Sequence, residues 1–419
     1  MTTNQRRETS SWSSIKPSHS SMRTVNPIRQ IVDKLRDEDL NPQKKKLSLS
    51  IGDPTVFGNL RTDKVVEEAV IRAVQSGACN GYAPSMGRDD ARKAVAKRCS
   101  TKNHVLKPSD VVICSGASGA LDICVQALCN EGDELLIPQP GFSLYTTLAG
   151  SKGIEARYYN LKPNDDWKVD LDHVKSLITD KTRAIIVNNP SNPCGSVYSA
   201  EHISEIIQLA EEYKLPIVAD EIYADMIFDE SNKFVRMAEL TETVPILSVG
   251  GIAKQYLVPG WRIGWICIYD KQGYLNLVRD GIQRLTTLIL GANTLIQGAL
   301  PDILEKVDES FYQNVNRSLK ESSDYTIERV SQIKGLSAIR PQGAMYCMIG
   351  IDLNMFDDSI RDDVEFSSLL LKEESLVVLP GQCFRMKNYF RVVTCPSKAD
   401  LVEAYDRLEA FCQRHLRKQ

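Results

Sequence analysis

The sequence predicts an α/β protein in which helices cover both faces of a mainly parallel sheet. From about residue 110 to residue 250, short apolar runs rich in Val and Ile alternate with longer amphipathic stretches. The runs lack polar alternation, as buried parallel strands do, and strand–helix alternation is typical of an α/β layer. The predicted strands are Val111–Cys114, Glu134–Ile137, Ala184–Val187, Pro216–Ala219 and Ile246–Val249, and the clearest helices between them are Ala120–Leu128 and Ala200–Tyr213.

A change of pattern after about residue 320 predicts a second, smaller α+β unit. A helix at Leu319–Ile333 precedes two strands, Met345–Ile351 and Phe390–Val393, and a helix at Lys398–His415 follows them. A chain of 419 residues exceeds the usual size of one domain. No internal repeat and no low-complexity linker separates the two parts, so we expect the domains to be tightly associated.

Composition excludes several classes of function. The 51 basic and 54 acidic residues give a net charge of −3, which argues against a nucleic-acid or anionic membrane partner. No run of eighteen or more apolar residues is present, so no membrane span is predicted. Eleven scattered cysteines without a C-x-x-C pair fit a reducing compartment, and five dispersed histidines predict no metal site.

Residues 1–21 differ from the rest of the chain. Ten of them are Ser or Thr, and Glu8 is their sole acidic residue. This composition predicts a disordered tail, taken as residues 1–22. The alternative is a transit peptide, since such segments are rich in Ser and Arg and poor in acidic residues. We therefore expect a cytoplasmic protein, with a mitochondrial location as the alternative, and the lack of an apolar segment argues against secretion.

Conspicuous residues follow the predicted strands, at the edge where open α/β sheets bind ligands. Ser115–Ala120 opens a helix, whose first N–H groups and dipole attract an anion, and Ser118 adds a hydroxyl donor. Asn188–Gly195 holds two Asn-Pro pairs, which either contact a ligand or only form turns. Asp220 ends a strand and, if buried, needs a cation or hydrogen-bond donors, although it could instead cap a helix.

The most informative segment runs from the predicted strand Ile246–Val249 to Trp265. Two glycines end the strand, Lys254 follows, and Arg262 stands eight residues later in a Pro-Gly-Trp turn. A lysine at the end of a buried strand is partly desolvated, which favours the neutral amine that condenses with an aldehyde. A fixed arginine beside glycines suits a phosphate. Together these residues indicate pyridoxal 5'-phosphate (PLP), although a lysine after a strand is often only a surface residue.

The order of these motifs resembles the PLP-dependent aminotransferases of fold type I, and within them the tyrosine aminotransferases. The resemblance runs from about residue 22 to 415 and implies an arm at 23–59 that joins the small domain, a large PLP-binding domain at 60–320 and a small domain at 321–419. The segments that carry it are Arg23–Arg29, Ser48–Leu60, Asn80–Ser85, Pro140–Tyr145, Asn188–Val197 and Leu257–Trp265.

The resemblance also implies roles for single residues. Lys254 would bind PLP as a Schiff base and move the proton, and Asp220 would pair with the pyridine nitrogen. The remaining implied cofactor contacts are Asn192 and Tyr223 to the ring's 3-oxygen, Phe142 on the ring face, Ala117, Ser118 and Arg262 at the phosphate, and Tyr82 at the phosphate of the other subunit of a homodimer. Arg391 would bind the substrate α-carboxylate in a bidentate pair, with Gly52, Asn192 and Arg29 at the same end.

The implied reaction converts L-tyrosine and 2-oxoglutarate to 4-hydroxyphenylpyruvate and L-glutamate, the first step of tyrosine catabolism. Two departures bear on it. Gly251 stands where some aminotransferases have a phosphate-binding serine, and the tyrosine aminotransferases also have glycine at this position. The segment Leu288–Thr294 lacks the arginine with which aspartate aminotransferases bind a second carboxylate. The alternatives are a kynurenine, alanine or methionine aminotransferase, a C–S lyase of the same fold, or a non-catalytic regulator of this fold.

Overall fold

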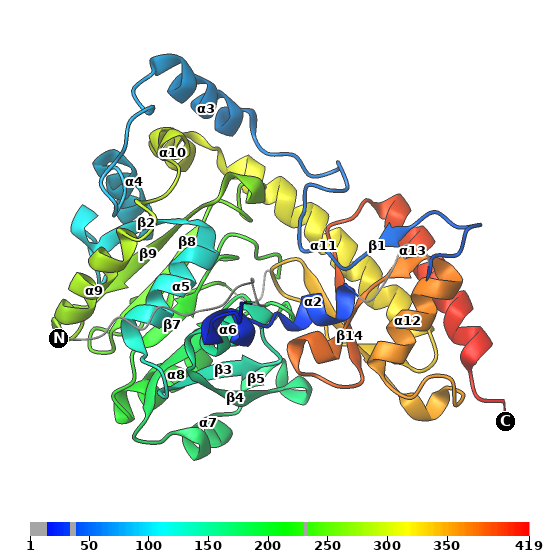
Figure 1. The fold of residues 1–419 in the computed structure, drawn as a ribbon. Helices are drawn as coiled ribbons and strands as arrows, with labels where there is room; N and C mark the ends of the chain where they lie inside the picture. The colour runs from blue at the N-terminus through cyan, green and yellow to red at the C-terminus, as the bar shows by residue number, and fades with distance from the viewer. Residues whose placement is uncertain (1–14, 34–38, 230–232, 419) are drawn as a thin grey trace, which may run out of the picture.

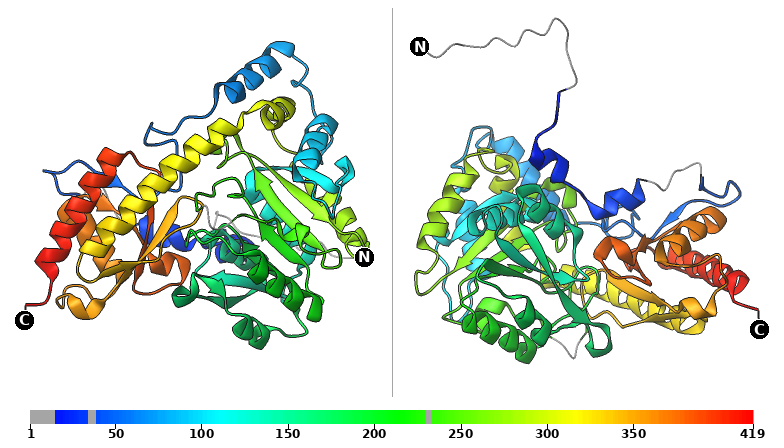
Figure 2. Two further views of the ribbon diagram at one scale, coloured as in Figure 1. Left: turned by 180° about the vertical axis from the view of Figure 1, so that it is seen from behind. Right: turned by 60° about the horizontal axis from the view of Figure 1, so that its bottom comes forward.

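The computed structural model describes residues 15–33, 39–229 and 233–418, which form two units that lie side by side (Figure 1). The larger unit is built on a long sheet and the smaller one on a short antiparallel sheet. Helix α11 (Glu309–Gln332) runs from the first unit into the second, as both the front and the rear view show (Figure 2).

Within the described residues the large sheet has eight strands, in the order β2-β9-β8-β7-β6-β3-β4-β5. Its pairs from β8 through β7, β6 and β3 to β4 are all parallel, which confirms the predicted fold class. Each of the five predicted strands is present. The bounds are β2 Val111–Ser115, β3 Glu134–Gln139, β4 Glu155–Lys162, β5 Lys168–Val169, β6 Thr182–Asn188, β7 Ile217–Asp220, β8 Ile246–Gly251 and β9 Ile263–Tyr269.

Strand β9 is not among the strands predicted from the sequence, although its residues form a continuous apolar run. It lies between β2 and β8 and pairs antiparallel with both. Because β9 runs opposite to both neighbours, β2 keeps the direction of the parallel strands. The carboxyl ends of β2, β3, β6, β7 and β8 therefore share one edge of the sheet, and the chain from β8 to β9 turns at that edge.

Helices cover both faces of this sheet (Figure 1). In β6, Ile185 and Val187 face one hydrophobic core, whereas Ala184 and Ile186 face another. Burial on both faces explains why the strands read as unbroken apolar runs. The helices of this unit are α3 Lys64–Ser76, α4 Asp89–Cys99, α5 Gly116–Leu128, α6 Ser143–Lys152, α7 Leu171–Leu177, α8 Ala200–Glu212, α9 Asn276–Thr286 and α10 Thr294–Lys306.

The smaller unit has four antiparallel strands in the order β10-β11-β14-β13 within the described residues. The two strands and the last helix predicted here are confirmed. Helix α11 begins ten residues before the predicted helix, because Asp308 caps it by accepting a hydrogen bond from Ser310 N at 2.9 Å. The predicted domain boundary at residue 320 falls inside α11. The bounds are β10 Leu336–Ala338, β11 Tyr346–Ile351, β13 Leu379–Pro380, β14 Tyr389–Val393, α12 Asp363–Glu374 and α13 Lys398–His415.

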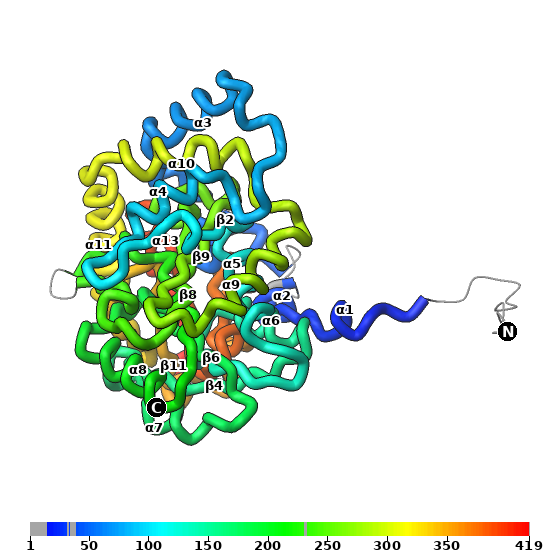
Figure 3. The backbone as a smooth tube through the Cα atoms, turned by 90° about the vertical axis from the view of Figure 1, so that its left-hand side faces the viewer, coloured from blue at the N-terminus to red at the C-terminus, as the bar shows by residue number. Residues whose placement is uncertain are grey.

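The N-terminal part of the chain crosses from one unit to the other. Residues 1–14 of the predicted tail lie outside the described residues, and α1 (His19–Arg23) projects from the body of the molecule beside α6 (Figure 3). Helix α2 (Pro27–Val32) follows, and β1 (Leu47–Ser48) pairs in parallel with β12 (Leu376–Val377) of the smaller unit. None of the helices described is long and apolar enough to span a membrane.

Candidate active site

A cavity of about 450 Å³ lies at the carboxyl edge of the large sheet, where the smaller unit closes over it. The structure brings every predicted site residue except Tyr82 to its wall. Those residues are Lys254, Asp220, Tyr223, Asn192, Phe142, Ala117, Ser118, Arg262, Arg391, Gly52 and Arg29. Tyr82 is 93% exposed and lines no part of this cavity, so within one chain it lies apart from the other site residues.

One end of the cavity is built for an anion. Helix α5 starts at Gly116, directly after β2, and Ser115 makes no side-chain cap to its first N–H groups. The guanidinium of Arg262 lies against this helix start, at the place a Cβ on Gly116 would occupy, and Gly116 has a φ of +72°. A helix N-terminus beside an arginine, with the Ser118 hydroxyl on the same wall, suits a phosphate group.

Asp220 ends β7 in the middle of the cavity wall and is 3% exposed. Its Oδ2 accepts a hydrogen bond from the Tyr145 hydroxyl at 2.6 Å, and its Oδ1 accepts one from Ile222 N at 3.3 Å. No helix follows Asp220, so it is not a helix cap. Burial raises the pKa of Asp220 to about 6, although the bond from Tyr145 acts against this shift. The two neutral donors therefore favour the ionised carboxylate against the effect of burial, and a cationic ligand group would lower its pKa further.

Lys254 stands three residues after β8, and its Nζ donates a hydrogen bond to Gly52 O of the N-terminal segment. The amine is partly buried and opens into the cavity. The ring of Phe142 lies on the same wall and meets Tyr145 edge to face, with centroids 5.8 Å apart. The amine, the carboxylate of Asp220 and this aromatic face thus surround one space.

Arg391, on β14 of the smaller unit, closes the opposite end of the cavity and is 3% exposed. Its Nη1 donates to Asn192 Oδ1 at 2.9 Å and its Nη2 to Ser50 O at 2.7 Å. The guanidinium lies 4.4 Å from the centre of the Tyr346 ring, and Nε is buried without a hydrogen-bond partner among the described residues. Burial lowers the pKa of Arg391, so a carboxylate that entered the cavity would supply the missing counter-charge.

Two tyrosines at the site have no role assigned to them from the sequence. Tyr145 ends the segment Pro140–Tyr145, and its phenol is the donor to Asp220. Tyr346 lies in a predicted strand, and its hydroxyl bonds the Tyr223 hydroxyl at 2.8 Å. It also fills the space in front of Gly52, because a Cβ on Gly52 would collide with the Tyr346 hydroxyl. A buried tyrosine usually needs a partner for its hydroxyl, but the sequence does not say which.

The residues fit PLP on two observations of this structure. The buried carboxylate of Asp220 has no ion pair among the described residues, as expected if a protonated ring nitrogen completes it. The cavity also combines a primary amine with an anion site formed by α5 and Arg262. Among the described residues there is no cluster of His, Cys, Asp and Glu that could hold a metal ion.

Comparison with known proteins gives the same family throughout. The profile of the family "Aminotransferase class I and II" matches residues 44–408. The chain is 47% identical over 402 residues to the tyrosine aminotransferase of Mus musculus, covering 96% of this chain and 88% of that one. It is 45% identical over 409 residues to the tyrosine aminotransferase of Dictyostelium discoideum, covering 96% and 97%.

Solved structures agree with this result. The tyrosine aminotransferase of Leishmania infantum superposes with a TM-score of 0.92 at 37% identity, over 97% of this chain and all of that one. An alanine aminotransferase from Pyrococcus furiosus superposes with a TM-score of 0.90 at 32% identity, over 96% and 100%. The chain belongs to the class I and II aminotransferase family.

Proposed function

We propose that this aminotransferase uses PLP to transfer the amino group of L-tyrosine to 2-oxoglutarate, forming 4-hydroxyphenylpyruvate and L-glutamate. The observation that carries the proposal is the position of Lys254 in one cavity with Asp220 and with Arg391. The preference for tyrosine rests on the similarity to relatives with that name. When bound, PLP supplies the electron sink that makes the Cα–H bond of an amino acid acidic enough to break.

With PLP bound, some residues of the chain would hold the cofactor and one would move the proton. The N–H groups that open α5, the Ser118 hydroxyl and Arg262 would hold the phosphate, and Asp220 would keep the pyridine nitrogen protonated. Asn192 and Tyr223 would donate hydrogen bonds to the 3-oxygen, and Phe142 would pack against the ring. Lys254 Nζ, tethered beside the cavity, would take up the proton from the substrate Cα and later give it up.

Substrate recognition follows from the charges along the cavity wall. The described residues that line the cavity include four cationic side chains, Arg29, Lys254, Arg262 and Arg391. We assign Lys254 and Arg262 to the cofactor and Arg391 to the α-carboxylate, which leaves Arg29 for the second carboxylate of 2-oxoglutarate. The side chain of Arg29 is 73% exposed on α2, and its solvent-exposed ion pair with Asp33, at 3.6 Å, holds it only weakly, so it can turn inward. Ile51 and Leu379 on the same wall offer apolar surface to the ring of tyrosine.

An alanine aminotransferase activity is the second candidate function. The alanine aminotransferase of Pyrococcus furiosus also superposes over nearly the whole chain, so the fold by itself does not choose the amino donor. A panel of donors (tyrosine, phenylalanine, kynurenine, alanine and methionine) with 2-oxoglutarate separates these activities. A C–S lyase would instead release a thiol from its substrate without any oxo acid.

The first prediction tests the proposed function itself. Borohydride reduction of the yellow holoenzyme should fix a pyridoxyl label on one residue, Lys254, because it is the only lysine among the described residues that line the cavity. The labelled peptide is identified by mass spectrometry, and tyrosine should be the best donor of the panel. A label on another lysine would contradict the assignment of the site, and a better donor than tyrosine would contradict the proposed substrate.

The second prediction separates the two proposed carboxylate-binding arginines. Arg391→Leu should lower kcat/KM at least about 100-fold for both tyrosine and 2-oxoglutarate, because both present an α-carboxylate to one charged, bidentate donor. Arg29→Leu should lower it about tenfold for 2-oxoglutarate alone, since tyrosine has no second carboxylate. Steady-state kinetics with each substrate varied measure this. Equal losses for both substrates in Arg29→Leu would refute its role in specificity.

We further propose that the enzyme works as a homodimer whose partner chain supplies Tyr82. The turn at Gly81–Gly87 contacts the end of α9, where Thr286 Oγ1 donates to Ser85 Oγ at 2.9 Å. Tyr82 and the neighbouring Leu288, Ile289 and Leu290 are each at least 60% exposed, which is unusual for so apolar a group. A second copy of this chain would cover these side chains and bring Tyr82 to the other phosphate site.

The third prediction uses mixed dimers. Tyr82→Asp should be nearly inactive because it sets a carboxylate beside the phosphate, and Lys254→Ala should be nearly inactive because it lacks the base. When the two variants are unfolded and refolded together, each hybrid dimer should contain one site with both changes and one intact site. Activity should therefore rise far above either parent. If hybrids confirmed by native mass spectrometry show no recovery, Tyr82 does not act across the interface.

The proposed location is the cytoplasm. All eleven cysteines lie within the described residues, and each is free and buried. Unpaired cysteines are expected in a reducing compartment.

A further inference from the structure

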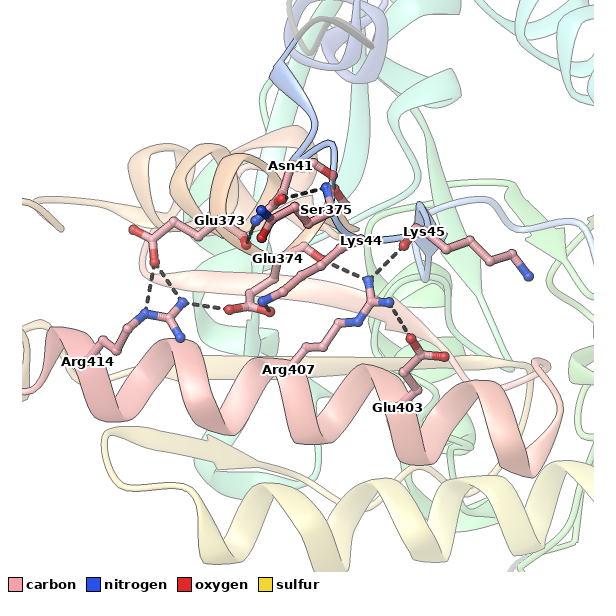
Figure 4. A network of polar contacts seen from close by, with 10 residues as sticks. Asn41, Lys44, Lys45, Glu373, Glu374, Ser375, Glu403, Arg407 and Arg414 are labelled. Carbon is pink, nitrogen blue, oxygen red and sulfur yellow. Dashed lines mark hydrogen bonds and ion pairs between the residues drawn. The ribbon is translucent and has the colours of Figure 1, made fainter.

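A buried carboxylate lies between the two ends of the chain, outside the cavity. Glu374, the last residue of α12, is 1% exposed. Its side chain pairs with Lys44 of the N-terminal segment on one side and with Arg414 of α13 on the other, the latter at 2.6 Å (Figure 4). Removing one partner of a buried ion pair leaves an uncompensated charge, so this carboxylate strongly favours having both cations in place.

Arg407 of α13 reinforces the same junction through the backbone. Its Nη1 donates to the carbonyl oxygens of Lys45 at 2.7 Å and of Glu374 at 2.8 Å (Figure 4). One guanidinium therefore joins the N-terminal segment to the end of α12. We call Lys44, Glu374, Arg407 and Arg414 the clasp.

The segment that leaves the clasp leads directly to the cavity. Leu47 N donates to Ser375 O at 2.9 Å, Leu49 N donates to Val377 O at 2.8 Å, and Leu49 O accepts from Val393 N at 2.8 Å. The chain thus lies between β12 and β14. After it, Ser50 O accepts from Arg391 and Gly52 O accepts from Lys254. The two groups proposed to bind the substrate and to move the proton both bond to this one segment.

The strand pair between the clasp and the cavity is short. β1 and β12 are each two residues long, and a pair of that length has little stability without other contacts. The upstream end of the segment therefore needs an anchor if the carbonyls of Ser50 and Gly52 are to stay in register. The six peptide units from Lys44 to Ser50 span at most about 20 Å in an extended chain, so a displacement of Lys44 can reach the carbonyl of Ser50.

We infer that Glu374 is a positioning residue, whose clasp on Lys44 and Arg414 sets the segment 44–52 and thereby the orientation of Arg391 in the cavity. Glu374 touches no substrate, and it acts through the backbone of Ser50. The inference rests on the proposed function, because the role of Arg391 in binding carboxylates belongs to that proposal.

The fourth prediction compares two adjacent glutamates. Glu374→Gln keeps the size of the side chain but removes the charge between Lys44 and Arg414, and it should raise KM about five- to tenfold for tyrosine and for 2-oxoglutarate. The value of kcat should change less than twofold, because Lys254 and Asp220 are placed by β8 and β7 of the large sheet, which the clasp does not include. Glu373→Gln is the matched control. The carboxylate of Glu373 also pairs with Arg414, at 2.7 Å, and with His415, at 2.8 Å, but is not paired with Lys44, so KM should stay within twofold of wild type.

A second readout is independent of catalysis. Hydrogen exchange of the holoenzyme followed by mass spectrometry should show faster exchange at Leu47 and Leu49 in Glu374→Gln, because their amides hold the segment to β12. The amides of β11 should exchange as in wild type. If Glu374→Gln does not fold, Lys44→Met breaks the clasp from its exposed side and should give the same exchange pattern and the same rise in KM.

Three results would overturn the inference. The first is an unchanged KM in both Glu374→Gln and Lys44→Met, and the second is an equal rise in KM in Glu373→Gln. The third is faster exchange throughout the small unit, since that indicates general loss of stability. If the proposed function is wrong, the wild-type enzyme will not use tyrosine as a substrate. The exchange pattern tests the clasp independently of which substrate the enzyme uses.

Discussion

The carboxylate of Asp220 is buried at the end of β7, and both of its hydrogen-bond donors among the described residues, the Tyr145 hydroxyl and Ile222 N–H, are neutral. A buried carboxylate without a cation is costly, and the raised pKa of Asp220 expresses that cost. Tyr145 keeps the group ionised by donating a hydrogen bond, and a protonated ring nitrogen would complete the pair. The protein thus holds a buried carboxylate that has no ion pair among the described residues, and the proposed cofactor would supply the missing cation.

The neighbouring parts of the site depend on close contacts between backbone segments. A Cβ on Gly264 of β9 would collide with the backbone of Gly116 and Ala117, so β9 can lie directly under the start of α5 only because glycine stands there. This contact places the turn that carries Arg262 beside the helix N-terminus. The start of β9 is therefore part of the proposed phosphate site, since the turn that carries the chain from Lys254 to Arg262 leads directly into it.

The sequence predicts the strand-end residues well because two regular signals coincide there. Apolar runs locate the parallel strands, and the edge rule for parallel sheets then brings Asp220, Lys254 and the start of α5 together. Tyr145 and Tyr346 escape such reasoning, because their partners are 75 and 123 residues away in the chain and no local pattern links them. Glu374 escapes it too, since a glutamate near a helix end looks like any solvated residue. The role proposed for Tyr82 involves a second subunit, so the structure of one chain does not test it.

The most direct test of this account compares Asp220→Asn with the wild-type enzyme in two quantities, the rate of proton abstraction and the affinity for PLP. The release of deuterium from Cα-deuterated tyrosine in a single turnover measures proton abstraction, and equilibrium dialysis measures PLP binding. We expect proton abstraction to fall at least about 100-fold, because the charge that keeps the ring nitrogen protonated is lost. PLP binding should weaken by no more than about tenfold, because the phosphate contacts remain. Wild-type proton abstraction in Asp220→Asn would contradict the account.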